Sequence, residues 1–64
     1  MITKKQAKIG ARVRWTGQAT IDYGTITHVD GKHFEVRWDQ PDPDSGEDTF
    51  TYNTDERQSS VNLA

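Results

Sequence analysis

The sequence predicts a small all-β domain of five short strands closed into a barrel, and two observations lead to this prediction. Apolar and polar side chains alternate in short runs, most regularly over 33–39 (His-Phe-Glu-Val-Arg-Trp-Asp), which is the period of a strand with one buried face. No run has the length and period of a helix. Five short strands expose two sheet edges unless the sheet closes on itself, so we expect a small barrel.

Length and composition limit the chain to one domain. It has 64 residues and no cysteine, so we expect a single core without a disulfide or a thiolate zinc site, in a reducing, cytoplasmic setting. Leu, Ile, Val and Phe make up only 11 residues, which raises disorder as an alternative. The regular alternation and a net charge of only −2 favour a folded domain, stable only marginally or with help from self-association.

No stretch approaches the roughly 20 apolar residues of a membrane helix. The opening residues, Met-Ile-Thr-Lys-Lys, lack the apolar run of a signal peptide. We therefore expect a protein that neither spans a membrane nor is exported.

The first half of the barrel is predicted as three strands. The first covers 11–16, with Val13 and Trp15 on one face and Ile9 continuing the same parity. The second covers 23–29, where Gly24 indicates a bulge or bend. Asp30-Gly31 predicts a tight hairpin turn, and the third strand covers 33–39.

The second half is less regular. Residues 39–48 hold both prolines and five acidic residues without a base, which predicts an exposed loop. A fourth strand follows over 49–52, and a short helical turn over 53–56 precedes the closing strand, 61–63. We assign 1–8 to a basic N-terminal arm and 9–64 to the barrel domain.

Three segments resemble the opening strands of SH3-like barrels of the Tudor and related types, which begin with a Gly-x-x-Val segment. They are 9–15 (Ile-Gly-Ala-Arg-Val-Arg-Trp), 24–26 (Gly-Thr-Ile) and 34–39 (Phe-Glu-Val-Arg-Trp-Asp). The resemblance covers about residues 9 to 63, and it implies a binding module for peptides, methylated side chains, nucleic acid or other subunits.

One enzyme family has a similar opening at 10–14, the plasmid-encoded type of dihydrofolate reductase, which assembles from short SH3-like chains. That family places a Gln-Ile-Tyr element in the strand corresponding to 49–52, and here only Tyr52 matches. We therefore do not expect this activity.

The chain offers no evident catalytic or metal constellation. No serine has a neighbouring base that would activate it, and His28 with His33 would supply only two ligands beside the predicted hairpin. In the acidic loop, Gly46 stands where a calcium-binding loop needs a further acid. We expect no catalytic residue, no cofactor and no bound metal.

Two functions remain. The leading one is a non-catalytic module that binds a protein or peptide partner in a groove between 16–23 and 39–48, with five candidate binding residues: Trp15, Tyr23, Asp39, Asp42 and Asp44. Exposed aromatic side chains with acids nearby suit a cationic ligand. We expect a monomer or a weak homo-oligomer.

The alternative function is nucleic-acid binding by an accessory protein. Residues 1–20 carry a charge of +5 and residues 21–64 a charge of −7, so the basic N-terminal part could meet phosphate. Its candidate residues are Lys4, Lys5, Lys8, Arg12 and Arg14. Attraction between the two oppositely charged parts of the chain is an equally simple use of these charges.

Overall fold

The computed structural model describes residues 1–17, 21–54 and 60–64. It contains five strands: β1 (Arg12–Thr16), β2 (Ile21–Asp30), β3 (His33–Trp38), β4 (Thr49–Asn53) and β5 (Val61–Leu63). The predicted all-β class and the number of strands are confirmed. No helix occurs in the described ranges, and the helical turn expected over 53–56 falls partly outside them.

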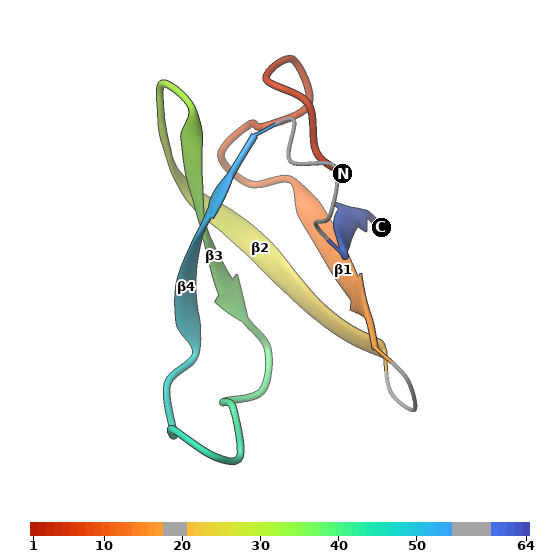
Figure 1. Ribbon diagram of the computed structural model, residues 1–64, viewed down its shortest axis with the longest axis vertical. Helices are drawn as coiled ribbons and strands as arrows, with labels where there is room; N and C mark the ends of the chain where they lie inside the picture. Colours follow the sequence, from red (N-terminus) through yellow and green to blue (C-terminus); the bar gives the residue numbers. More distant parts are fainter. Residues whose placement is uncertain (18–20, 55–59) are drawn as a thin grey trace.

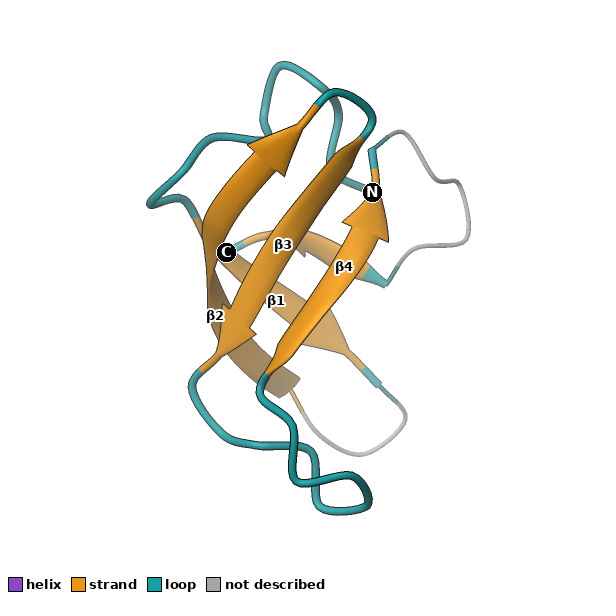
Figure 2. Cartoon of the chain, turned by 90° about the vertical axis from the view of Figure 1, so that its left-hand side faces the viewer, coloured by secondary structure: helices purple, strands orange, loops and turns teal. Residues whose placement is uncertain are grey.

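The strands form one antiparallel sheet in the order β4-β3-β2-β1-β5 (Figure 1). β2 is the long central strand: its first part pairs with β1, from Ile21 to Thr25, and its second part pairs with β3, from Gly24 to Asp30. The sheet is so strongly twisted that β1 crosses behind β2, β3 and β4 (Figure 2). Among the described strands, β4 and β5 are the two edges and do not pair, so the sheet is open where the sequence predicted a closed barrel.

The irregularity in β2 lies after Ile26, not at Gly24 as predicted. The register with β3 shifts between Ile26 and His28. Ile26 is buried and Val29 packs against the same core, a spacing of three that a strand can accommodate only with one extra residue.

Gly24 instead marks the closest approach of β3 to β2. A Cβ atom there would lie 2.7 Å from Cγ1 of Val36 and 2.9 Å from Cε3 of Trp38, well inside van der Waals contact. Glycine at this position lets the two strands pack without a side chain between them.

The β2–β3 hairpin turn is shifted by one residue from its predicted position. Asp30 pairs with His33, so Gly31 and Lys32 form the two-residue loop. Gly31 has a φ of 58°, a left-handed conformation that glycine adopts without steric cost.

The hydrophobic core fills one end of the concave face of the sheet. Phe34 and Val36 of β3 belong to it with Ile26 of β2. The buried hydrophobic residues of the described ranges are Ile2, Ala7, Val13, Ile26, Phe34, Val36 and Val61. The alternation predicted for β3 therefore describes its buried face correctly.

The N-terminal segment packs on this core. Residues 1–8 were assigned to a basic arm, yet Ile2 and Ala7 are buried. A turn places them together, since the N–H groups of Gln6 and Ala7 both donate to the carbonyl of Thr3, each at 3.0 Å. The terminal ammonium of Met1 also donates to the side chain of Asn62 on β5.

Ile9 does not continue the buried face of β1, as its parity had indicated. It is 70% exposed, because the chain turns at Gly10, whose φ is 90°. The N–H of Gly10 donates to the carbonyl of Ile26 at 2.8 Å, so the turn is fixed against β2.

We predict that the N-terminal segment is part of the folding unit. Ile2→Ala removes a fully buried side chain and should lower the free energy of unfolding by about 2–4 kcal/mol, and Ile2→Val by about 1 kcal/mol. Lys4→Ala, an exposed position in the same segment, is the control and should change it by less than about 0.5 kcal/mol. Denaturant unfolding measures all three, and equal stability of Ile2→Ala and Lys4→Ala would contradict the prediction.

Candidate functional site: an aromatic groove

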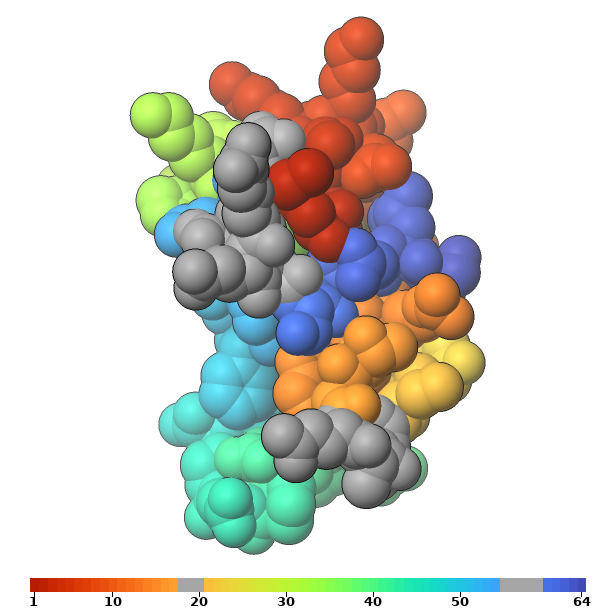
Figure 3. All heavy atoms as spheres, turned by 45° about the vertical axis from the view of Figure 1, so that its right-hand side comes forward, coloured from red at the N-terminus to blue at the C-terminus, as the bar shows by residue number. Residues whose placement is uncertain are grey.

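A groove of about 320 Å³ lies on the concave face beyond the end of the core. Its walls come from β1, the start of β2, β3, β4 and the loop after β3. The lining residues are Trp15, Asp22, Trp38, Gln40, Pro41, Asp42, Pro43, Phe50 and Tyr52. In Figure 3 the orange atoms of β1 and the cyan atoms of β4 meet on one face above the teal atoms of the acidic loop.

One wall is built by aromatic contacts between β3 and β4. The indole N–H of Trp38 donates to the hydroxyl of Tyr52 at 3.1 Å, and the two rings meet edge to face with centroids 6.2 Å apart. On its other side Tyr52 stacks on the core residue Phe34 at 5.7 Å. The groove wall is thus anchored in the core, which holds the rings in place.

Tyr52 presents a polar group inside this apolar wall. Burial raises the pKa of its phenol, an effect that the hydrogen bond from Trp38 partly offsets. The hydroxyl therefore stays protonated at neutral pH. Because it accepts from Trp38, its own proton remains available for a second partner.

The opposite wall is Trp15 on β1. Its indole is 37% exposed, and a Cβ at Gly17 would lie 2.2 Å from the six-membered ring, so the backbone of Gly17 packs flat on it. Trp15 is paired with Asp22 across the β1–β2 ladder. Paired residues point to the same face of a sheet, so the carboxylate of Asp22 lies beside the indole.

The acidic loop closes the third side and is held by its own hydrogen bonds. Oδ2 of Asp42 accepts from the backbone N–H and the hydroxyl of Ser45, at 3.2 and 3.0 Å. The N–H of Gly46 donates to the carbonyl of Asp42 at 2.7 Å, with Gly46 at a φ of 74°. Asp42 thereby shapes the loop that carries Pro41 and Pro43 into the groove.

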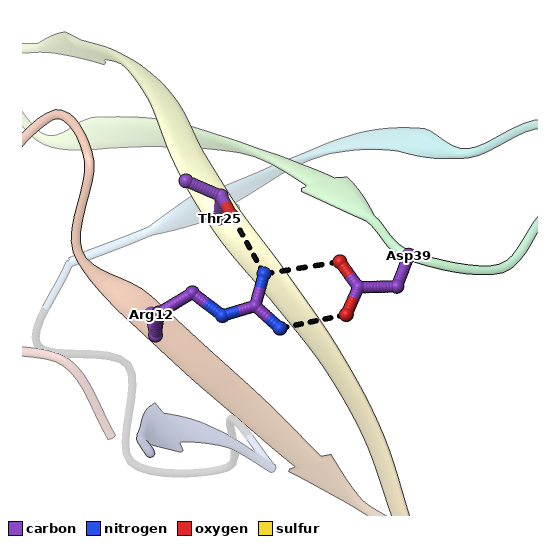
Figure 4. A network of polar contacts seen from close by, with 3 residues as sticks. All are labelled: Arg12, Thr25 and Asp39. Atoms are coloured by element: carbon purple, nitrogen blue, oxygen red, sulfur yellow. Dashed lines mark hydrogen bonds and ion pairs between the residues drawn. The ribbon is translucent and has the colours of Figure 1, made fainter.

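The outer face of the sheet carries a separate ionic cluster (Figure 4). The guanidinium of Arg12 donates to both carboxylate oxygens of Asp39, at 3.0 and 2.6 Å, and to the hydroxyl of Thr25 at 2.7 Å. These bonds lower the pKa of Asp39 and raise that of Arg12. The pair joins β1 to the end of β3 across β2.

The structure brings only some of the candidate binding residues together. Trp15 and Asp42 both line the groove. Tyr23 is 44% exposed but pairs with Arg14 on the outer face. Asp39 forms an ion pair with Arg12. Asp44 is exposed in the acidic loop, outside the groove lining. The basic candidates Lys4, Lys5, Lys8, Arg12 and Arg14 are all exposed. Among the described residues, Arg12 is the one of them that forms an ion pair, with Asp39.

The alternation of apolar and polar residues also predicts that three aromatic residues of the groove belong to the core: Trp38, Phe50 and Tyr52. They do lie on the inward face, but they are only partly buried. The signal for Trp38 and Phe50 was their position beside the proline-containing loop, where the small core runs out. Tyr52 lies farther along β4, opposite Phe34, and had no such signal.

The histidines lie at the other end of the sheet. His28 is paired with Glu35, and Asp30 with His33, around a second hollow of about 240 Å³. In the part of the chain that the structure describes, no group of three or more His, Asp or Glu side chains could hold a metal ion.

Fold and site together define a five-stranded antiparallel β-domain with an aromatic groove at one end. Comparison with protein-family models, with curated proteins and with solved structures found no significant match. No helix of the described residues is long and apolar enough to cross a membrane.

The Arg12–Asp39 pair predicts a defined pH dependence of stability. The pKa of Asp39 in the folded protein is lowered from its ordinary value of 3.8. The ion pair therefore contributes fully to the free energy of unfolding above pH 3.8, and this contribution is lost as the pH falls through the folded-state pKa. Arg12 stays charged throughout. Wild type should therefore be more stable than Asp39→Asn at pH 7, and the difference should shrink between pH 4 and pH 2.

Denaturant midpoints over this pH range measure the effect. Asp44→Asn is the matched control, because Asp44 is exposed and has no ion pair with another described residue. A pH-independent difference between wild type and Asp39→Asn would show that the pair does not act through the charge of Asp39.

Proposed function

We propose that this protein is a non-catalytic binding module whose aromatic groove receives a peptide or an extended segment of a protein partner. The observation that carries the proposal is the groove itself, in which four aromatic side chains face a common space of about 320 Å³. Its volume lies at the small end of ligand sites, which suits one or two side chains of a larger ligand.

The charge of the groove favours a cationic ligand. Its lining, as far as the described residues form it, contains two carboxylates, those of Asp22 and Asp42, and no lysine or arginine. The carboxylate of Asp22 makes no hydrogen bond or ion pair with another described residue, so its charge is available to a ligand. An arginine or lysine side chain could stack on Trp15 or Trp38 and reach either carboxylate.

We also propose that the sheet represents an SH3-like architecture, as the resemblance in the first three strands implies. The strand order supports this, because consecutive strands β1 to β4 pair in turn and β5 returns beside β1. A cytoplasmic location and a monomeric or weakly associating state remain predictions from composition.

The groove proposal predicts that Trp15 is required for binding. Peptides selected from a random display library on the immobilised wild-type protein should be enriched in arginine or lysine next to apolar residues. Trp15→Ala should lower the affinity for these peptides at least about tenfold, because aromatic anchors dominate such interfaces. Titration followed by the fluorescence of the remaining tryptophan or by calorimetry gives the affinities.

The matched control is Ile21→Ala, which removes another exposed apolar side chain (54% exposed) outside the groove lining. It should bind the selected peptides within about twofold of wild type. Peptides that bind Trp15→Ala as tightly as wild type would overturn the proposal, as would a library that yields no enriched sequence.

Nucleic-acid binding is the second candidate, and one contact favours it. Arg14 is paired with the exposed Tyr23 on the outer face, so a phosphate contact and a stacking ring are neighbours. The lysines at 4, 5 and 8 are exposed as well. Against it, Arg12 already has its charge matched by Asp39.

This second candidate predicts a binding activity that depends steeply on salt. Single-stranded DNA or RNA should bind at low ionic strength, and Arg14→Glu should weaken the binding at least about tenfold. Arg14 is the better test position, because charge reversal at Arg12 also breaks its pair with Asp39. Gel-shift or anisotropy titrations at two salt concentrations decide the matter, and no binding at low salt rejects nucleic acid as the partner.

A further inference from the structure

The edge strand β4 presents an ordered row of backbone groups. Two backbone hydrogen bonds fix its parity: the N–H of Trp38 donates to the carbonyl of Asp48, and the N–H of Thr54 donates to the carbonyl of Lys32, each at 2.7 Å. Hydrogen-bonded pairs alternate along an antiparallel ladder, so the even-numbered residues of β4 point their backbone groups at β3. Thr49, Thr51 and Asn53 therefore point theirs away from the sheet.

This edge lacks the usual features that prevent strand pairing. β4 is the first strand in the sheet order and pairs only with β3 among the described strands. Its sequence, Thr-Phe-Thr-Tyr-Asn, contains no charge, proline or glycine and consists mostly of residues that favour strands. The opposite edge, β5, is only three residues long, and its shortness itself limits pairing.

We propose that β4 is the docking edge for the partner, which adds to the sheet as an extended segment carrying basic residues. The inference rests on the proposed binding function and specifies how the groove is used. Backbone hydrogen bonds to Thr49, Thr51 and Asn53 supply affinity, and the groove beside them selects side chains.

The edge and the groove are two sides of the same strand. Phe50 and Tyr52 of β4 line the groove, and side chains on an added strand point alternately to the two faces of the sheet. Those on the inner face come to lie next to Phe50 and Tyr52, so one segment satisfies both the edge and the groove.

Charge identifies a basic partner rather than a second copy of this chain. Glu47 and Asp48 stand immediately before β4, and Asp42 lies in the adjoining loop. Among the residues that the structure describes, only Asp48 of these three acids has a base nearby, Arg37, at 3.5 Å. If β4 of a second copy paired antiparallel with this β4 and the two strands were centred on Thr51, Thr54 of one copy would lie beside Asp48 of the other. Such pairing would bring no positive charge to these acids.

The test uses synthetic seven-residue peptides with valine and threonine alternating between an arginine at each end. Titration into the full ¹⁵N-labelled chain should shift the amide resonances of Thr49, Thr51 and Asn53 together with the indole N–H signals of Trp15 and Trp38. The same peptide with glutamate at both ends should bind at least tenfold more weakly. Equal binding of the two peptides would overturn the basic partner.

Backbone methylation of the peptide tests strand pairing without altering the protein. Successive residues of a strand direct their N–H groups to opposite edges. Methylating the peptide nitrogens that face β4 should therefore weaken binding at least tenfold, whereas methylating those that face away should weaken it less. Equal effects of both sets would overturn strand addition.

Variants at position 51 give the complementary test. Thr51→Pro removes an N–H that faces away from β3, so it leaves the β3–β4 ladder intact. It should lower the affinity for the arginine-containing peptide at least tenfold. Thr51→Val keeps the N–H and should bind within twofold of wild type. The amide spectrum of each variant reports whether it is folded.

The outcomes separate the two proposals. If Thr51→Pro is folded and binds normally while Trp15→Ala does not bind, strand addition is wrong and the groove function stands. If no peptide binds wild type, both are wrong. If the free protein instead forms a dimer that Thr51→Pro abolishes, the occupant of the edge is a second copy, and the basic partner is wrong.

Discussion

The close packing of β3 on β2 at Gly24 is the constraint on which the rest of the structure depends. With no side chain at this position, atoms of Val36 and Trp38 lie 2.7 and 2.9 Å from where a Cβ would be. Val36 then belongs to the core, whereas Trp38 extends past its end and fixes Tyr52 through a hydrogen bond and an edge contact. The groove is therefore the continuation of the core packing, at the point where a small chain has no further apolar side chains with which to fill it.

The outer face stabilises the same junction with charge. Arg12 reaches across β2 to Asp39, with Thr25 as the intermediate contact (Figure 4). This use of Arg12 explains part of the charge division along the sequence, because a base from the positive half neutralises an acid from the negative half. The acids that line the groove have no basic partner among the described residues, so under the proposed function the two faces of one sheet would have different electrostatic roles: internal attraction outside and ligand selection inside.

Much of the fold could be predicted from the sequence, since local patterns determine it. The alternation over β3 identifies Phe34 and Val36 as core, and the spacing of turn residues gives five strands. What failed depends on contacts between distant segments. Ile2 is buried only because a turn returns the N-terminus to β5, and Gly24 mimics the signature of a bulge although tertiary crowding explains it. For the site, exposure could be inferred for Trp15, but Tyr23 faces the other side, since one residue along a strand reverses the face.

The size of the domain bears on how it can bind. A core of seven buried hydrophobic residues among those described cannot also enclose a deep pocket, so binding as proposed would use surfaces that folding leaves open: the strand ends and the sheet edge. An edge strand gains from a partner the backbone hydrogen bonds that closure of a barrel would otherwise provide. β4 carries this edge and half of the aromatic groove at once. Under the proposed function, the incomplete sheet would supply the backbone site for binding, and the acids beside it would supply the selectivity.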